Sequence, residues 1–449
     1  MPHRLQRLNQ LILASFAAIA LALLFWSVLR GDSLLLRDDN PRLVEAELRI
    51  QRGAIVDRHG TVLAVNEGTP ERQLRRYPLP GMEPAVGYYS LRFGTSGVEE
   101  SFGAVLRGDP ASPLLAWEQR LLHRPQVGTG VQLTLDAGWQ QTAVSHFRNQ
   151  TGALVLLELH DNAPAQIRAL VSQPGYDPNL LDEQFDVLVA DETAPLLNRA
   201  TQGQYQPGLL LQPFIVAAAA ASNELLLNAT VENPNRPVPI GSVVTRCSSR
   251  PPEPATWSDV VTHHCPAPLR DLGDRLGAAR LDQIFADFGL TTPPLLPLAT
   301  ETAVSAPTSD PVLAAIGQEH LTVTPLQLAI ALAALGNNGR LPTLQLVTAT
   351  GSDASGWEAV VGEEGGEKTA VAPTPARAIA QALPQSNNSL TFSRLVLSGP
   401  EATNNSWYLA LAPANQPRYA LVIVVENSDT RSAAEGIGQA VFAEVFSNQ

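Results

Sequence analysis

The sequence predicts a mixed α+β fold carried on a single N-terminal transmembrane helix. The chain has 449 residues, which is enough for two or three domains. An uncharged run extends from Leu11 to Leu29, paired apolar runs separated by polar turns recur from Gly152 onward, and the stretch after Gly208 is too apolar for a surface helix. The paired runs predict antiparallel strands, and a helix that is apolar on all sides is expected in a core.

The run from Leu11 to Leu29 is just long enough to cross a bilayer, since a spanning helix needs about 20 apolar residues. Arg4 and Arg7 precede it, and basic residues favour the cytoplasmic side. We therefore expect residues 1–10 to be a cytoplasmic tail, residues 11–29 to anchor the chain in the plasma membrane, and the main domains to be extracytoplasmic. A cleaved signal peptide is the alternative, but its apolar region would be shorter and followed by a small-x-small site.

Charge and composition exclude some classes of partner. The formal net charge is −13, so the chain does not have the basic surface with which proteins bind nucleic acid. Only 16% of the residues are charged, and 45% are hydrophobic, which fits a globular protein with a membrane segment. Lys368 is the only lysine, so almost all basic charge comes from arginine.

The part of the chain that follows the anchor predicts a small β-rich domain. Apolar residues flank Asp57–Gly60, whose polar side chains and final glycine are typical of a hairpin turn. Pro125–Gly130 is rich in Pro, Gly and Thr, which is typical of a domain boundary. We therefore assign residues 30–127 to one domain and residues 128–449 to a second.

The second domain begins with a predicted strand from Val131 and a helix for which Asp136 is the expected N-cap. Two apolar runs within 152–179 enclose a polar turn and predict a hairpin of a central sheet. Thr324-Pro325 is a good helix start, because proline is favoured in the first turn. Two strands between residues 407 and 427 and a helix at 433–446 are expected to close the fold.

Five separated segments resemble motifs of class B penicillin-binding proteins. In chain order they are RGAIVDRHGTVLA from Arg52, GTSGVEESFGAVLRG from Gly94, GYDPN from Gly175, NRATQGQYQPG from Asn198 and GQEHLTVTPLQ from Gly317. The resemblance extends from about residue 50 to the C-terminus, although residues 65–85 and 340–385 match poorly. It implies a β-rich pedestal at 30–127 below a serine β-lactamase-like transpeptidase domain at 128–449, with an antiparallel sheet flanked by helices.

The resemblance also implies a chemistry. The family acylates itself on a D-alanine carbonyl of a peptidoglycan stem peptide and passes the acyl group to an amine of a neighbouring stem. It uses a Ser-x-x-Lys motif, in which the lysine takes the proton of the nucleophilic serine, a Ser-x-Asn motif, and a Lys-Thr-Gly strand that binds the substrate carboxylate. Backbone N–H groups stabilise the oxyanion.

The positions of this chain that correspond to the motifs lack these side chains. Serine and lysine of the first motif fall on Leu209 and Gln212, and the Ser-x-Asn motif falls on His264-Cys265-Pro266. The Lys-Thr-Gly motif falls on Leu397, Ser398 and Gly399, and the next residue, Pro400, has no N–H for the oxyanion. We therefore expect no intact catalytic residue.

The scarcity of lysine supports this expectation without any alignment. Gly365 lies three residues before Lys368, so no Ser-x-x-Lys or Thr-x-x-Lys exists in the chain. Ala370 follows Lys368-Thr369, so no Lys-Thr-Gly exists either. The ordinary acyl transfer of the family is therefore excluded by the sequence, whichever register is chosen.

The resulting hypothesis is a pseudoenzyme, a catalytically inactive penicillin-binding protein that acts as a scaffold or regulator in cell-wall synthesis. By resemblance, its expected partner is an integral-membrane glycan polymerase of the SEDS type or an active penicillin-binding protein. One alternative is a protein that binds peptidoglycan stem peptides without turnover. Another is a residual D,D-transpeptidase with a non-standard nucleophile or with His264 in the proton transfer.

The chain has two cysteines, Cys247 and Cys265, and both lie on the predicted extracytoplasmic side. A disulfide is the leading interpretation, because this compartment is oxidising. A zinc site that adds His263 and His264, or two free thiols, are the alternatives. We expect neither a cofactor nor a metal.

Overall fold

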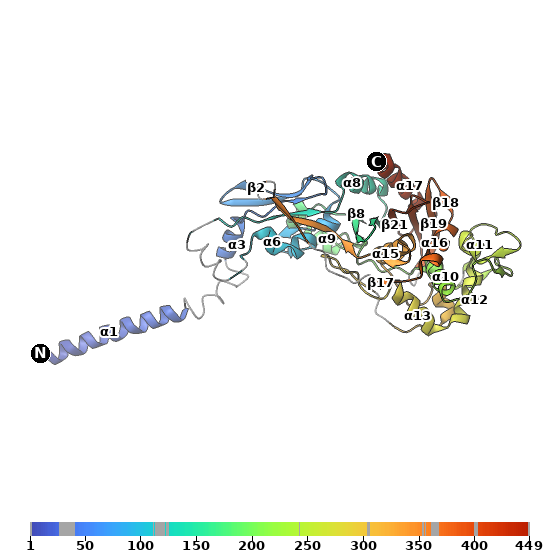
Figure 1. The fold of residues 1–449 in the computed structure, drawn as a ribbon. Coiled ribbons are helices and arrows are strands. Elements are labelled where there is room, and N and C mark those ends of the chain that lie inside the picture. Colours follow the sequence, from blue (N-terminus) through green and yellow to red (C-terminus); the bar gives the residue numbers. More distant parts are fainter. Residues whose placement is uncertain are drawn as a thin grey trace.

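The computed structural model describes residues 2–26, 41–110, 112, 122, 125–241, 243–302, 306–352, 354, 356–360, 368–398 and 403–447. Helix α1, Pro2–Leu24, stands apart from the rest of the described chain (Figure 1). Its segment Gln6–Leu24 is long and apolar enough to cross a membrane, and none of it is buried. Residues 27–29 of the predicted anchor lie outside the described residues.

A six-stranded sheet, here called the pedestal sheet, follows α1. Its strand order is β16-β15-β6-β1-β2-β3, with β1 and β6 parallel and the other pairs antiparallel. The strands are β1 Ile55–Val56, β2 Val62–Thr69, β3 Arg72–Arg76, β6 Gly130–Leu133, β15 Val347–Ser352 and β16 Gly356–Ala359. The helices α3 Pro41–Leu48, α4 Glu83–Val86, α5 Gly97–Ser101 and α6 Gly103–Arg107 belong to the same region.

The pedestal sheet takes strands from both sides of the predicted boundary at residues 127 and 128. β6 follows the boundary directly, whereas β15 and β16 come from the stretch 340–385, which resembles the family poorly. The predicted hairpin turn at Asp57–Gly60 joins β1 to β2, and the Asp57 Oδ1 accepts hydrogen bonds from the N–H groups of His59 and Thr61 at 2.8 Å. The other carboxylate oxygen, Oδ2, accepts from the Ala137 N–H at 3.1 Å, which ties the turn to the second domain.

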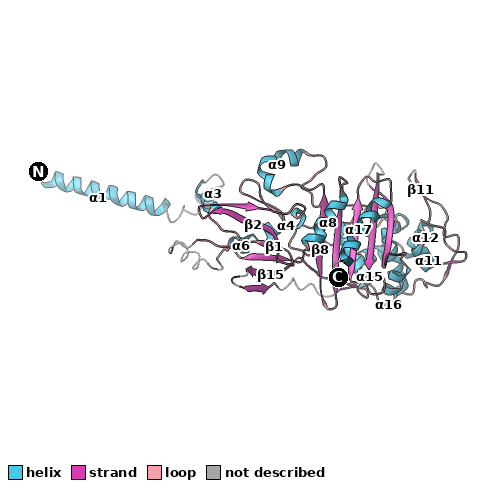
Figure 2. Cartoon of the chain, turned by 90° about the horizontal axis from the view of Figure 1, so that it is seen from above, coloured by secondary structure: helices cyan, strands magenta, loops and turns pink. Residues whose placement is uncertain are grey.

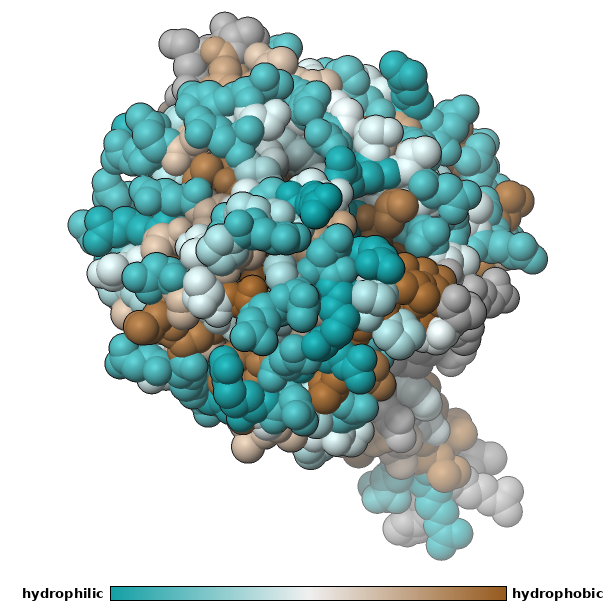
Figure 3. Space-filling view, turned by 90° about the vertical axis from the view of Figure 1, so that its right-hand side faces the viewer, coloured by the Kyte–Doolittle hydropathy of each residue, from teal (hydrophilic) through white to brown (hydrophobic). Residues whose placement is uncertain are grey.

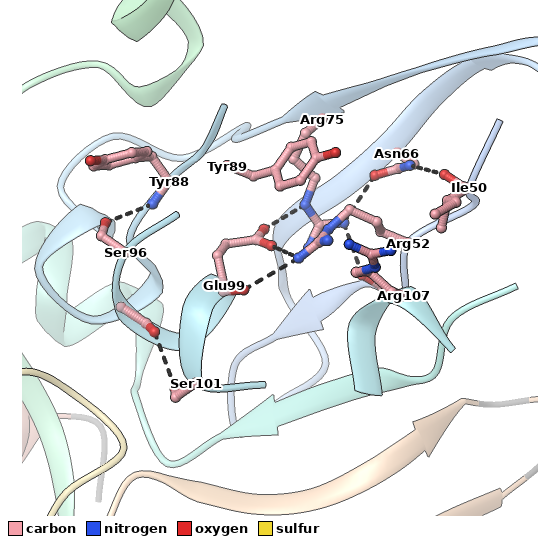
Figure 4. Close-up of polar contacts among 12 residues, drawn as sticks. Ile50, Arg52, Asn66, Arg75, Tyr88, Tyr89, Ser96, Glu99, Ser101 and Arg107 are labelled. Carbon is pink, nitrogen blue, oxygen red and sulfur yellow. Dashed lines mark hydrogen bonds and ion pairs between the residues drawn. The ribbon is translucent and has the colours of Figure 1, made fainter. Parts of the chain in front are cut away.

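A buried ion-pair cluster connects two of the pedestal motifs (Figure 4). The Glu99 carboxylate accepts from Arg52 Nη2 at 2.8 Å and from Arg75 Nε at 2.5 Å. All three side chains are almost fully buried, with exposures between 0% and 3%. Gly53 lies next to this cluster, and a Cβ there would lie 2.0 Å from the Thr129 carbonyl oxygen. These motif residues therefore act in folding, by pairing charges and allowing two backbones to approach.

The second domain is built on a seven-stranded sheet of order β14-β8-β7-β21-β20-β19-β18. All neighbouring strands are antiparallel except β14, which pairs in parallel with β8 at one edge. The strands are β7 Gly152–His160, β8 Ala163–Gln173, β14 Leu344–Gln345, β18 Gln385–Ser386, β19 Ser389–Ser398, β20 Thr403–Ala412 and β21 Tyr419–Val425. The predicted hairpin at 152–179 is confirmed as β7 and β8.

Helices cover both faces of this sheet, as predicted. On one face lie α8, Ala137–Phe147, and α17, Ser432–Ser447 (Figure 2). On the other face lies α15, Pro325–Gly336, which packs on β7, β20 and β21. Asp136 caps α8 through the Trp139 N–H, and Thr324 with Gln327 forms a capping box on α15. Both predicted helix starts are confirmed.

The apolar stretch after Gly208 forms the short 3₁₀ helix η3, Gly208–Leu211, and the α-helix α10, Gln212–Ala221. All residues from Gly208 to Ala219 are buried, so the prediction of a core helix is confirmed. Helices α11 Trp257–Thr262, α13 Ala278–Asp287 and α16 Pro373–Ala382 pack against α10. The described chain also contains α9 Leu181–Ala190, α12 Pro266–Leu276 and α14 Pro311–Ala315.

Several short ladders complete the described chain. They pair β4 Tyr89–Ser90 with β5 Gly94–Thr95, β9 Thr230–Val231 with β12 Ala255–Thr256, β10 Val238–Ile240 with β11 Val243–Thr245, and β13 Arg340–Leu341 with β17 Lys368–Thr369. The hairpin of β10 and β11 is important for the site, because it stands opposite the edge of β19 across a cavity.

Candidate functional site

A cavity of about 420 Å³ lies between η3, the β11 segment and β19. Its wall includes Leu209, Val243, Ile316, Arg394, Leu397 and Arg431. The structure therefore brings together Leu209 and Leu397, the residues predicted to correspond to the family's nucleophile and carboxylate-binding lysine. We call this cavity the cleft.

Backbone contacts hold η3 in place at the floor of the cleft. The Gly208 N–H donates to the Gly317 carbonyl at 3.1 Å, and Tyr205 exchanges two backbone hydrogen bonds with Val323. Gly208 has φ of 52°, and a Cβ there would lie 2.6 Å from Val396 Cγ1. Glycine is therefore required at position 208 both for its conformation and for the close approach of η3 to β19.

A polar network fixes the segment that precedes η3. Arg199 Nε donates to Glu426 Oε1 at 2.9 Å, and the Tyr205 hydroxyl donates to the same oxygen at 2.7 Å. Burial and the nearby Glu426 carboxylate raise the pKa of Tyr205 far above its usual value, so its hydroxyl stays protonated. The residues of the NRA and Tyr-x-Pro-Gly motifs thus retain a structural role.

Gln212, which the sequence analysis predicts to correspond to the family's lysine, is fully buried. Its Nε2 donates to the Cys265 carbonyl at 2.9 Å, whereas its Oε1 has no hydrogen-bond partner within the described residues. A neutral amide does not take a proton from a hydroxyl, and Leu209 offers no hydroxyl. Leu209 and Gln212 therefore contribute packing and the one hydrogen bond of Gln212.

His264 is buried and its ring lies against Phe392, with 3.9 Å between the ring centroids. Its Nδ1 is 3.2 Å from the Ser248 hydroxyl oxygen, and its Nε2 has no hydrogen-bond partner in the described chain. Burial, followed by the positive charges of Arg394 and Arg431, lowers the pKa of His264 to about 3. Pro266 lies at the start of α12 and is also buried. Neither residue belongs to the wall of the cleft.

Leu397 and Ser398 form the end of β19. The Ser398 carbonyl accepts from the Thr403 hydroxyl at 3.2 Å, and Leu397, the residue predicted to replace the family's cation, adds an apolar side chain to the lining of the cleft. Gly399 and Pro400, the remaining predicted positions, lie outside the described residues.

Arg394 is a candidate site residue that the sequence analysis missed. From β19 its guanidinium donates to the Ser248 and Thr245 hydroxyls at 2.6 and 2.7 Å, and to the carbonyls of His264 and Arg246 at 3.2 and 3.0 Å. Burial and the nearby Arg431 lower its pKa to about 10, so it stays charged at neutral pH. A single charged residue inside an otherwise uncharged strand was the available signal.

Cys247 and Cys265 form a disulfide, which joins the β11 segment to the start of α12. The two thiols are therefore not free to bind zinc with His263 and His264. In the chain outside the gaps given above, no group of three or more His, Cys, Asp or Glu side chains is arranged to hold a metal.

The comparisons with known proteins agree with the architecture. A family model described as the penicillin binding protein transpeptidase domain matches residues 155–447. Peptidoglycan D,D-transpeptidase PbpA of Mycolicibacterium smegmatis is 28% identical over 466 residues, which cover 93% of each chain. PbpA of Mycobacterium tuberculosis is 28% identical over 490 residues, which cover 97% of each chain.

Solved structures give the same result. The imipenem acyl-enzyme complex of penicillin-binding protein A from M. tuberculosis superposes with a TM-score of 0.79 at 26% identity, covering 90% of this chain and 100% of that one. The family model spans more than half of the chain, and the relatives are matched over nearly their whole length. The protein therefore belongs to the penicillin-binding protein transpeptidase family.

Proposed function

We propose that this protein is a catalytically inactive member of its family and acts as a scaffold or regulator in peptidoglycan synthesis. The observation that carries the proposal is the cleft itself. Its floor is formed by η3 and its edge by β19, and Leu209 and Leu397 stand at the positions predicted for the family's nucleophile and carboxylate-binding lysine. The rest of the fold matches PbpA over nearly its full length.

The chemistry of the remaining groups supports inactivity. Acyl transfer needs a nucleophile and a base that can take its proton, and Gln212 is no base. His264 has a pKa of about 3, so it is a weak base near neutral pH, and it does not line the cleft. Pro400 removes one expected oxyanion donor, which by itself costs about 10²- to 10³-fold in rate. The missing nucleophile, base and oxyanion donor would all be needed for the same reaction step, acylation of the protein.

The features that are retained support a scaffolding role. The buried cluster around Glu99, the Arg199–Glu426 pair and the capping box of α15 all stabilise the fold without taking part in chemistry. With α1 as an anchor and the N-terminus in the cytoplasm, the pedestal and the second domain would be extracytoplasmic. There the chain would contact a SEDS-type glycan polymerase or an active penicillin-binding protein.

The test is to incubate the full-length chain in detergent with a fluorescent penicillin, followed by denaturing electrophoresis. PbpA of M. tuberculosis, prepared in the same way, is the positive control, because an acyl-enzyme of that protein has been solved. We expect a labelled PbpA band and no label on this chain. A labelled band that disappears after preincubation with unlabelled penicillin would contradict the proposal.

A partner is then sought by photo-crosslinking from the pedestal of the chain in its native membrane. The proposal expects a crosslinked protein of the cell-wall synthesis machinery. Crosslinks to unrelated membrane proteins alone would contradict the scaffolding role while leaving the catalytic result intact.

A further inference from the structure

We propose that the cleft binds an extended acidic segment of a partner polypeptide, added alongside the free edge of β19. The proposal rests on the proposed function, because it assigns an occupant to a cleft that no longer performs acyl transfer. Three independent features carry it, namely an open strand edge, uncompensated arginine charge and exposed apolar side chains at the rim.

The outer edge of β19 is open beside the cleft. Its neighbour β18 pairs only with Ser389 and Leu390, and the Thr391 N–H donates to the Pro384 carbonyl at 2.7 Å. Beyond this point no strand among the described residues pairs with that edge. Because backbone groups alternate along a strand, Leu395 and Leu397 present their N–H and C=O groups to the same side as Thr391. Both residues line the cleft.

The cleft also contains positive charge without a counter-charge. Arg246, Arg394 and Arg431 all contribute to its wall, and none forms an ion pair within the described chain. The hydrogen bonds of Arg394 all go to neutral oxygens, so its charge is not neutralised. Since the chain as a whole carries −13, this local excess of positive charge indicates an anionic occupant.

Apolar side chains extend the surface beyond the charges. Val243 and Val244 of β11 are 41% and 61% exposed although they stand at the mouth of the cleft. Figure 3 shows that the end of the molecule opposite α1 is mostly hydrophilic and carries separate hydrophobic patches. Leu209, Ile316 and Leu397 continue an apolar lining into the cleft. A ligand that alternates acidic and apolar side chains would satisfy both kinds of surface.

A polypeptide fits these features better than a small anion. A small anion would use the arginines alone and would leave the backbone edge and the valines unpaired. An extended chain can hydrogen-bond to Leu395 and Leu397, place alternate side chains on the two sides of the edge, and thereby use all three features. The same geometry predicts that binding needs backbone N–H groups in the ligand.

The probe is the peptide acetyl-Glu-Val-Glu-Val-Glu-Val-amide with a fluorescein label, titrated with the full-length chain in detergent and followed by fluorescence anisotropy. Its ends are blocked, so a free terminal carboxylate is not tested. We expect saturable binding that is at least about tenfold tighter than that of the matching Lys-Val peptide and that weakens with added salt. N-methylation of alternate residues should weaken binding by at least about tenfold, because it removes the backbone donors.

Arg431→Gln tests the charge without disturbing the fold, because Arg431 is exposed and its side chain makes no hydrogen bond to any other residue that the structure describes. We expect binding to weaken by about tenfold. Arg275→Gln is the matched control, since Arg275 is exposed on α12 of the same domain and does not line the cleft. It should change binding less than about twofold.

Absence of saturable binding, equal binding of the Glu and Lys peptides, or equal effects of the two substitutions would overturn the proposal. A peptide that ends in D-alanyl-D-alanine serves as competitor. If it displaces the probe more effectively than the unlabelled probe peptide does, the cleft is a stem-peptide site and the proposal is wrong. Penicillin labelling is read separately, so failure of the proposed inactivity and failure of the peptide site are distinguishable.

Discussion

Glu99→Gln should destabilise the pedestal strongly although it changes neither volume nor any residue of the cleft. The Glu99 carboxylate is the partner of two guanidinium groups, Arg52 and Arg75, and its side chain is 0% exposed. Arg75 retains the Gly53 carbonyl at 2.8 Å and Asn66 Oδ1 at 3.2 Å. Arg52 retains the backbone carbonyl of residue 99 at 3.3 Å and its position over the Tyr89 ring, 4.3 Å from the centroid. The substitution therefore leaves two buried cations without a counter-charge.

The expected magnitude follows from this geometry. Removal of one partner of a buried pair costs about 3–5 kcal/mol, and glutamine avoids an additional cavity cost. With a urea m-value of about 2 kcal/mol per molar, a loss of about 3 kcal/mol lowers the midpoint by about 1.5 M. Hydrogen exchange of peptides that cover β1–β3, measured across a urea series, reports the pedestal separately from the second domain.

Glu100→Gln is the matched control, because Glu100 is the next residue and is exposed. Glu100→Gln should change the free energy of unfolding of the pedestal, as measured by hydrogen exchange, by less than about 0.5 kcal/mol. Adding Arg52→Met to Glu99→Gln should restore part of the loss, because it removes one of the two unpaired charges. Equal effects of the two glutamine variants, or no effect of Glu99→Gln, would refute the structural role assigned to the cluster.

Three further predictions concern the cleft and its supports. The pKa of His264 is about 3 in the folded chain against an ordinary value near 6.5, so its stabilising contribution is complete above pH 6.5 and is lost as the pH falls toward 3. Urea titrations should show that about 2 kcal/mol of the unfolding free energy is lost by pH 5. His264→Asn, which stays neutral, should remove this part of the pH dependence of the unfolding free energy. The combined change Cys247→Ser with Cys265→Ser removes the disulfide between two residues 18 positions apart and should lower the free energy of unfolding by about 3 kcal/mol. An unchanged unfolding midpoint would contradict this prediction. Gly317→Ala should destabilise η3, because Gly317 has φ of 64° and a Cβ there would lie 2.3 Å from the Gly208 carbonyl oxygen, and the anisotropy of the cleft-bound probe should therefore fall. Gly103→Ala is the control, because Gly103 is half-buried and no atom lies within 4 Å of the position its Cβ would take.

Signals that lie within a few residues of one another predicted much of the fold. The turn at Asp57–Gly60, the N-cap at Asp136 and the capping box at Thr324 each depend on side chains that bond to their own neighbouring backbone. The two apolar runs of the hairpin at 152–179 and the buried helix after Gly208 were predictable for a similar reason, since their patterns are uninterrupted. Burial in the structure confirms both.

Pairings across long separations were not predictable in the same way. β15, Val347–Ser352, joins the pedestal sheet beside β6, Gly130–Leu133, and nothing local in either segment specifies that partner. The site shows the same limit. Motif positions located Leu209 and Leu397, but Arg394 and Arg431 are separated in sequence and become one charged group only when β19 lies beside the start of α17.

The most direct test of the account is the intact mass of the full-length chain after incubation with imipenem, which forms an acyl-enzyme with PbpA of M. tuberculosis. The account predicts that the mass of this chain stays unchanged while PbpA gains one adduct under the same conditions. A stoichiometric adduct on this chain would contradict the absence of a nucleophile in the cleft, and peptide mapping of that adduct would identify the side chain that reacts.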